Sequence, residues 1–407
     1  MRTRIAAARV LPDAETVLEN AAVVVDDADG RIAWVGPAAD APAADATIDL
    51  PEATLAPGLV NAHSHLDLTH LKGTKRAGDF AAWLKAVREG RARPGMEAAA
   101  RWGIKEALSR GTTAFGDVCA PAGFRAMLAA FDETGARARV LVEALGFRPA
   151  VADRVWDEVW DLVEMHDLPP NVGTGVSPHS PYAVSRPLLE RAVAMADGHG
   201  RPLAIHVAET LEELAFLRHG IGPLREMLKE FGADDPGHAP EPATDGLLKA
   251  RDLRRPPLVL VPGNYLRPSH VPRGAFVAYC PTAHAYFGHP EHPVLELLEE
   301  GVRVVLGSDS AASGDTVDVL SETQHLGRAR PDLPPKAVFR MATDWGARAL
   351  VLDAGTLAPG RLADLAAFTP VAGHDVLGLP DARCVLTMVG GRVLHRAEEE
   401  GVRGQES

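Results

Sequence analysis

The chain has 407 residues, which is long enough for a large barrel of about 250 residues together with a smaller appended domain. Its 46% apolar and 24% charged residues are typical of an ordinary globular protein and exclude a disordered or membrane-embedded chain. The net charge of −13 leaves no basic excess to offset phosphate repulsion, which argues against a nucleic-acid partner.

The cysteines and the N-terminus predict a reduced, cytoplasmic setting. Cys119, Cys280 and Cys384 are odd in number, lie far apart and match no metal-binding or disulfide pattern. The first apolar stretch ends at Pro12 and is too short for a secretory signal, and no later run approaches membrane-spanning length. We therefore expect no membrane association, and the sequence leaves a homo-oligomer open.

Both ends of the chain show a pattern of short predicted strands separated by turns. In residues 1–56, apolar runs flank residues 26–30, a predicted hairpin turn. Residues 356–407 show the same pattern, with apolar runs at 365–368 and 384–389. Because chain termini often lie close together, we expect these two pieces to form the two halves of one small β-sandwich domain.

Residues 57–355 alternate compact apolar runs with longer amphipathic segments, a pattern typical of βα repeats and a parallel sheet. Helices are expected at residues 187–196, 211–218 and 294–300. Eight strands favour an α/β fold with a closed (β/α)8 TIM-like barrel, although a doubly wound sheet gives a similar local pattern. The eight candidate strands are residues 57–65, 112–118, 139–145, 172–178, 203–207, 258–261, 275–280 and 302–307.

Potential metal ligands follow three of these runs, and barrel enzymes carry their catalytic groups at the carboxyl ends of strands. His63 and His65 end the first run, where residues i and i+2 face the same side. His206 follows the fifth run and Asp309 the eighth. Three imidazoles and one carboxylate suit a single divalent ion, Zn²⁺ before Fe²⁺, and leave a position for water. Four unrelated polar residues at strand ends are the alternative.

Glu209 lies three residues after His206, where the same strand ends. It can move a proton between the water and a leaving group or ring nitrogen. It can equally be an acidic residue in the first turn of the next helix, where the helix dipole favours it. Spacing alone does not separate these two roles. Asp309 can also accept the first proton of the water.

The segment PGLVNAHSH, which ends at His65, resembles the first-strand motif of the amidohydrolase superfamily. The resemblance spans nearly the whole chain and is strongest for the branch with cytosine, guanine and aminofutalosine deaminases and triazine chlorohydrolases. It implies one metal bound by the His63 and His65 pair, His206 and Asp309, with Glu209 as acid and base. Later segments resemble further landmarks of the superfamily in order: GTT at 111–113, PHSPY at 178–182, HVAE at 206–209, GSDS at 307–310 and GTLAPGRLAD at 355–364.

Two features separate this chain from parts of that superfamily. No lysine lies between Lys105 and Lys229, which argues against relatives that bridge two metals with a carboxylated lysine. Glu143 is another conceivable bridge, and we expect it to be an ordinary strand-end carboxylate. Pro262 stands where relatives usually carry a sixth-strand histidine beside the metal-bound water. Its side chain can neither hydrogen-bond nor transfer a proton, so the usual mechanism is in question here.

Four further residues are weaker candidates. We predict that His284, which leaves the seventh strand, partly takes the place of the missing histidine as a catalytic group; ordering its own loop is the alternative role. His179 is a candidate to hold a polar substrate group. Trp83 is a candidate to stack on a flat ring, or else to pack in the core. Asp67 is a candidate substrate contact or orienter of a ligand.

The sequence thus predicts a metal-dependent hydrolase of small molecules that acts on carbon–nitrogen bonds other than peptide bonds. A hydrolytic deaminase of an amino-substituted heterocycle or nucleoside-like compound, working through a metal-activated water, fits best. Hydrolysis of a cyclic amide or of a chlorinated heterocycle is one alternative. A metal-binding homologue with impaired turnover is another, because of Pro262.

Overall fold

The computed structural model describes residues 1–75, 78–234 and 257–397. All eight predicted strands are present and form one parallel sheet, in which each strand lies beside its neighbour in chain order. The predicted TIM-like barrel is therefore confirmed. Its strands are β5 (Leu59–Ser64), β6 (Thr112–Cys119), β7 (Arg137–Ala144), β8 (Val172–Pro178), β9 (Leu203–Val207), β10 (Leu258–Pro262), β11 (Phe276–Tyr279) and β12 (Arg303–Leu306).

Backbone hydrogen bonds join the last strand to the first and close the barrel. The amides of Ser308 and Asp309 donate to the carbonyl of His63 at 3.0 and 3.1 Å. The amide of His65 donates in turn to the carbonyl of Asp309 at 3.1 Å. These bonds lie just beyond β12, and together with the sequential strand order they exclude the doubly wound alternative.

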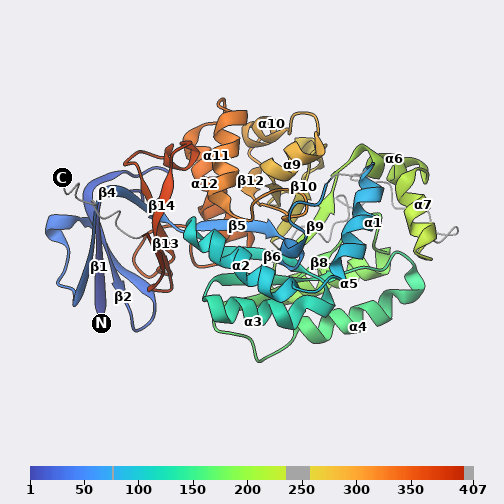
Figure 1. Ribbon diagram of the computed structural model, residues 1–407, viewed down its shortest axis with the longest axis horizontal. Helices are drawn as coiled ribbons and strands as arrows, with labels where there is room; N and C mark the ends of the chain where they lie inside the picture. The colour runs from blue at the N-terminus through green and yellow to red at the C-terminus, as the bar shows by residue number, and fades with distance from the viewer. Residues whose placement is uncertain (76–77, 235–256, 398–407) are drawn as a thin grey trace, which may run out of the picture.

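Helices surround the strands of the barrel (Figure 1). The three helices predicted from the sequence are present as α5, α6 and α10. No helix within the described ranges is long and apolar enough to span a membrane. The helices are α1 (Phe80–Arg91), α2 (Met96–Ser109), α3 (Phe124–Thr134), α4 (Ala152–Val163), α5 (Arg186–His199), α6 (Leu211–His219), α7 (Pro223–Glu230), α9 (Pro281–Phe287), α10 (Val294–Glu299), α11 (Val319–Ala329), α12 (Pro335–Ala342) and α13 (Asp344–Ala349).

Strand β9 illustrates why the barrel strands are continuous apolar runs in the sequence. Leu203, Ile205 and Val207 belong to the large core that packs strands against helices. Ala204 belongs to the separate core inside the barrel, and His206 alternates with its neighbours onto that same inner side. Both faces of the strand are buried, so its one polar residue is His206, on the inner side near the carboxyl end.

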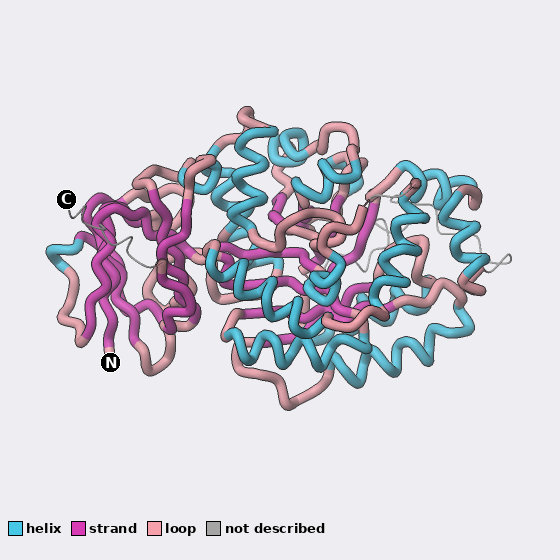
Figure 2. Tube along the Cα trace, viewed as in Figure 1, coloured by secondary structure: helices cyan, strands magenta, loops and turns pink. Residues whose placement is uncertain are grey.

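The two chain ends form one mixed sheet in the strand order β15-β14-β13-β4-β1-β2-β3. Strand β4 pairs with β1 along one edge and with β13 along the other, so the sheet is continuous where we had expected two facing sheets. Figure 2 shows it as a separate body beside the barrel. Its strands are β1 (Arg2–Val10), β2 (Leu18–Asp26), β3 (Arg31–Pro37), β4 (Ala46–Pro57), β13 (Leu365–Thr369), β14 (Arg383–Val389) and β15 (Arg392–Arg396).

One apolar cluster is shared by both chain ends. Ile5 and Val23 from the N-terminal strands pack in it with Leu365, Leu386 and Met388 from the C-terminal strands. All five side chains are at most 1% exposed. Neither half of the chain supplies both sides of this core, which is why the two ends pair.

A buried ion pair links the barrel to this end sheet. Arg137, the first residue of β7, donates to both carboxylate oxygens of Asp364 at 2.6 and 2.8 Å. The Asp364 side chain is 1% exposed and also accepts from the amide of Gly390. We expect Asp364→Ala to lower the free energy of unfolding by about 3–5 kcal/mol, because it leaves a buried guanidinium unpaired.

Denaturant unfolding of purified protein measures this change. Asp353→Ala is the matched control, since Asp353 pairs with Arg31 and Arg361 but is 46% exposed. The control substitution is expected to lower the free energy of unfolding by about 0–1 kcal/mol. Equal losses for the two variants would contradict a special role of the buried pair.

Candidate metal centre and active site

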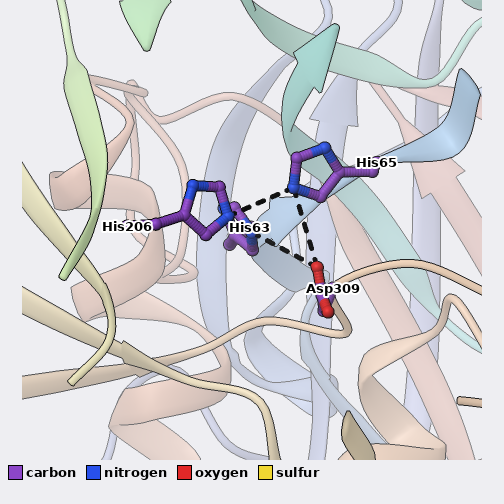
Figure 3. A group of neighbouring side chains, drawn as sticks. All are labelled: His63, His65, His206 and Asp309. Carbon is purple, nitrogen blue, oxygen red and sulfur yellow. Dashed lines mark hydrogen bonds and ion pairs between the residues drawn. The ribbon is translucent and has the colours of Figure 1, made fainter. Parts of the chain in front are cut away.

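The side chains of His63, His65, His206 and Asp309 converge at the carboxyl end of the barrel. Each offers one ligand atom, and the four atoms lie within 4.8 Å of one another. Nε2 of His65 is 3.4 Å from Nε2 of His206, and Oδ1 of Asp309 is 3.6 Å from Nε2 of both His63 and His65. Figure 3 shows the three rings and the carboxylate pointing toward one another.

Strand geometry and nearby hydrogen bonds orient the three imidazole rings. His63 and His65 lie on the inner side, while Ser64 between them turns away and donates to Asp117 at 3.0 Å. Nδ1 of His206 lies 3.0 Å from the carbonyl oxygen of His179. An imidazole that donates from Nδ1 keeps its Nε2 lone pair for a ligand, so this contact sets the tautomer that a metal requires.

Asp309 is held by its backbone and by one neighbour. Its φ of +56° lies in the left-handed region, which is uncommon for a residue with a side chain and is found at functional sites. Ser313 donates to its Oδ2 at 2.5 Å, and this leaves Oδ1 to face the imidazoles. Burial opposes ionisation, but the imidazole of His63 at 3.6 Å, with the Ser313 hydroxyl, holds the pKa of Asp309 below its ordinary value.

These four residues fit a single divalent cation. His63 is 1% exposed, and neither ring nitrogen has a hydrogen-bond partner among the described residues. Burial, with the neighbouring imidazoles, lowers the pKa of His65 and of His206, which favours the neutral rings that a metal ion requires. Ligands at 2.0–2.1 Å from a tetrahedral ion stand roughly 3.4 Å apart, which matches the observed spacing. A cation is the group that such a donor set accommodates.

Glu209 lies beside this set at the end of β9 and is 8% exposed. Its backbone is fixed twice: its amide donates to Glu213 at 2.8 Å, and its carbonyl accepts from Asn264 at 3.0 Å. Burial, with the negative charges of Asp309 and Glu213, raises the pKa of the Glu209 carboxyl well above its ordinary value. A carboxyl group in this environment can carry a proton at neutral pH and give it to a substrate.

A cavity of about 480 Å³ opens at the four-residue set. Its inner end is formed by His65, His206, Glu209 and Asp309. Its volume lies within the roughly 300–1,000 Å³ typical of small-molecule sites. The remaining wall is largely apolar and aromatic, with four arginines, and includes Phe80, Trp83, Val87, Arg88, Arg91, Phe147, Arg148, Arg154, Met227 and Phe231.

A buried ion-pair network forms one side of this cavity. Arg91 donates to Glu143 at 3.1 Å and lies 3.7 Å from the carboxylate of Asp67. Arg91 and Glu143 line the cavity, whereas Asp67 is 4% exposed and is not part of its wall. Asp67 thus contacts Arg91, and its role as a substrate contact or as an orienter of a ligand stays a prediction. Burial raises the pKa of Asp67 to about 6, while the charge of Arg91 holds the pKa of the equally buried Glu143 below its ordinary value.

His179 and Trp83 both line the cavity. The His179 ring stacks on His206 with centroids 5.0 Å apart, and its Nε2 lies 3.8 Å from Glu143. Trp83 stacks on Phe80 and meets Phe287 edge to face, within an apolar cluster. Both alternatives for Trp83 thus hold in geometry, since it is a core residue that also faces the cavity.

The histidines after β11 divide into different environments. His292 is 2% exposed, stacks on Tyr279 at 3.9 Å and contacts the carbonyl oxygen of Pro262 through Nε2 at 3.0 Å. Nε2 of His284 lies 2.8 Å from the carbonyl oxygen of Pro290. His284 and His289 both line a small second cavity that also borders Pro262 and the four-residue set. His284 thus lies near the predicted position, and its catalytic role stays a prediction.

Sequence reasoning missed Arg91, Tyr182 and Asn264 among the residues around the site. A signal for Arg91 exists, because it continues the helical spacing of Trp83 and Val87 on α1, and all three line the cavity. Asn264 carries no comparable signal. Its contact with the Glu209 carbonyl joins two neighbouring strand ends and depends on the three-dimensional fold.

Comparison with known proteins agrees with this geometry. The amidohydrolase family model matches residues 54–394. A 5-methylthioadenosine/S-adenosylhomocysteine deaminase of Halobacterium salinarum is 32% identical, covering 91% of this chain and 86% of that relative. An aminodeoxyfutalosine deaminase of Deinococcus radiodurans is 32% identical over 73% of each chain. The crystal structure of a Xanthomonas campestris adenosine deaminase with bound zinc has a TM-score of 0.78 and 26% identity, and covers 96% of this chain and 92% of that one. On these matches, the chain belongs to the amidohydrolase family.

Proposed function

We propose that this protein is a metal-dependent hydrolytic deaminase of an adenosine-like nucleoside. One observation carries the proposal: His63, His65, His206 and Asp309 converge on one point, and the buried carboxyl of Glu209 lines the same cavity as His65, His206 and Asp309. The relatives are named as deaminases of 5-methylthioadenosine, S-adenosylhomocysteine and aminodeoxyfutalosine. These names point to an amino-substituted purine nucleoside as the substrate class.

The ligand set of the proposal is His63, His65, His206 and Asp309, with Zn²⁺ favoured over Fe²⁺ because borderline nitrogen donors in tetrahedral spacing suit it. A metal held there supplies Lewis acidity, which makes a water molecule nucleophilic at neutral pH. Asp309 would hold that ion through Oδ1, which faces the imidazoles, and its carboxylate would take up the first proton of the water.

Glu209 then works as the proton carrier of the reaction. Its carboxyl, whose pKa is raised, would give its proton to a ring nitrogen of the substrate, then take the proton of the hydroxyl group added to the ring carbon and pass it to the departing ammonia; the proton held by Asp309 would restore the carboxyl. The aromatic wall around Trp83 holds the flat ring, and His179 with the Arg91–Glu143 pair offers hydrogen bonds to polar substituents. The apolar surroundings exclude bulk water.

A reducing, cytoplasmic setting fits the same picture. Cys119, Cys280 and Cys384 are all buried and unpaired. Secreted proteins usually pair their cysteines, whereas cytosolic proteins keep them reduced.

Ammonia release from a panel of nucleosides tests the proposal, with metal content measured on the same sample. We expect about one metal ion per chain and release of ammonia from 5-methylthioadenosine, S-adenosylhomocysteine, 5′-deoxyadenosine or aminodeoxyfutalosine. Inosine-type products and unsubstituted purine nucleosides serve as negative controls. A fully loaded sample with two ions per chain would contradict the single-ion site. A loaded sample inactive on the whole panel would contradict the deaminase.

A further inference from the structure

The turn that carries Glu209 has a backbone conformation that side chains disfavour. Strand β9 ends at Val207, and Ala208 has a φ of +52°, in the left-handed region that a residue with a Cβ rarely adopts. Helix α6 then begins at Leu211, with Thr210 as its N-cap. The reversal at Ala208 therefore sets the direction in which Glu209 leaves the strand and reaches the cavity that it lines.

Glu213, in the first turn of α6, binds the backbone amides of this turn. Its Oε1 accepts from the amide of Ala208 at 2.9 Å, and its Oε2 accepts from the amide of Glu209 at 2.8 Å. The residue is fully buried. Burial raises the pKa of Glu213 to about 7, and the amides of Glu209, Ala208 and Thr210 oppose that rise because they stabilise the carboxylate. Each oxygen of the carboxylate thus holds one amide of the turn.

The carbonyl groups of the same turn are held by a different segment, the loop after β10. The donors to the carbonyls of Val207, Ala208 and Glu209 are, in that order, the amides of Gly263 and Tyr265 at 3.2 Å each and the side-chain amide of Asn264 at 3.0 Å. Without the Glu213 carboxylate, the amides of Ala208 and Glu209 would lose these acceptors, and buried amides rarely stay unpaired. The conformation of the turn therefore depends on Glu213.

We propose that Glu213 is a positioning residue, whose carboxylate holds the left-handed turn at Ala208 and thereby directs the Glu209 side chain toward the substrate. This inference rests on the proposed function, in which Glu209 carries the proton. Capping α6 is the alternative role, because acidic residues in the first turn often cap a helix. The N-cap is already provided by Thr210, whose hydroxyl accepts from the Glu213 amide at 3.1 Å.

Glu213→Gln tests the position of Glu209 directly. Glutamine keeps the size of the side chain but has one acceptor oxygen, and its NH2 group meets the second amide. In crystal structures of the metal-loaded proteins, we expect the Glu209 side chain of the variant to lie about 1 Å or more from its wild-type place, with metal content unchanged. Because Glu213 also contributes negative charge beside Glu209, this displacement is measured before activity. An unmoved Glu209 would overturn the proposal.

Kinetics on the best nucleoside of the panel is the second measurement. Glu213→Asp keeps the charge but withdraws both oxygens by one methylene, so it separates position from charge. Both Glu213 variants are expected to lower kcat roughly 10- to 100-fold with little change in KM, because they misplace the proton carrier and leave the cavity wall intact. Thr210→Val is the matched control, since it removes the N-cap but neither of the two acceptors. It is expected to lower thermal stability and to keep kcat close to the wild-type value.

A double variant shows whether Glu213 acts through Glu209. In the Glu209→Gln background, we expect Glu213→Gln to cause little further loss of kcat, because the group that it positions is gone. Full additivity of the two losses would overturn the positioning role, and so would wild-type kcat in both Glu213 variants. Equal kcat losses for Thr210→Val and Glu213→Gln would assign Glu213 to the helix cap instead. A wild-type protein inactive on every nucleoside would defeat the proposed function, while the crystal structures would still decide whether Glu213 holds Glu209 in place.

Discussion

Glu209→Gln is expected to keep the metal and to lose almost all turnover. Glutamine preserves the shape of the side chain and lies outside the four-residue set, so the ligands are undisturbed. It replaces the carboxyl group, whose pKa is raised by burial and by two neighbouring carboxylates, with an amide that cannot exchange a proton. General acid–base groups contribute on the order of 10²–10⁴-fold, so we expect kcat to fall by about 10³-fold.

Three measurements on one preparation check this expectation: metal content, KM and kcat. His206→Ala is the counterpart, since it removes one of the four donors and is expected to lose most of the metal along with activity. Glu190→Gln, at a 65%-exposed side chain on α5, is the matched control and is expected to behave as wild type. A Glu209→Gln protein that keeps wild-type kcat would show that the proton carrier is another group.

Deletion of residues 360–407 is expected to unfold the protein. We propose that residues 1–56 and 356–407 are two halves of one domain attached to a barrel at 57–355; residues 398–407 lie outside the described part of the chain. The deletion removes β13, β14 and β15, leaves the end of β4 without a partner strand, and opens the shared core. It also removes Asp364, the buried carboxylate that pairs with Arg137.

The expected loss of unfolding free energy exceeds the whole stability of a typical domain, which is about 5–15 kcal/mol. Thermal unfolding, expression in soluble form and near-ultraviolet circular dichroism are the measurements. Two point variants in the same segment provide a graded control. Leu386→Ala, in the shared core, is expected to cost about 2–5 kcal/mol, and Val393→Ala, 43% exposed, about 0.5 kcal/mol or less. A truncated chain with a cooperatively folded, metal-binding barrel would contradict the proposed domain.

Much of the candidate site could be predicted because strand periodicity is a local property. The i, i+2 spacing of His63 and His65 gives both rings one direction whatever the rest of the chain does. Glu209 differs, because its spacing alone fits a helix first turn as well as a proton carrier. Its burial, together with the charges of Asp309 and Glu213, raises its pKa, and both depend on segments that only the tertiary structure brings together.

Contacts between distant segments were beyond the reach of the sequence. Asp67 looked like a substrate contact because it follows the histidine pair, but Arg91 from α1 lies over it and turns it toward the protein. The same arginine pairs with Glu143, on a strand about fifty residues away in the chain. Whether an ionisable side chain faces the cavity or a partner depends on which elements pack together, and spacing carries no information on that.

By itself, the sequence determined the barrel, the pairing of the chain ends and the identity of the four converging side chains, because apolar periodicity and short motifs report local geometry. The tertiary structure decided the rest. Closure of β12 onto β5 sets the distance between Asp309 and the histidine pair, because the paired residues Ser64 and Asp309 are separated by 244 residues of chain. Continuity of β4 with both β1 and β13 turns the expected sandwich into one sheet. Packing around Pro262 forms the small second cavity, whose volume depends on close contacts that no single segment specifies.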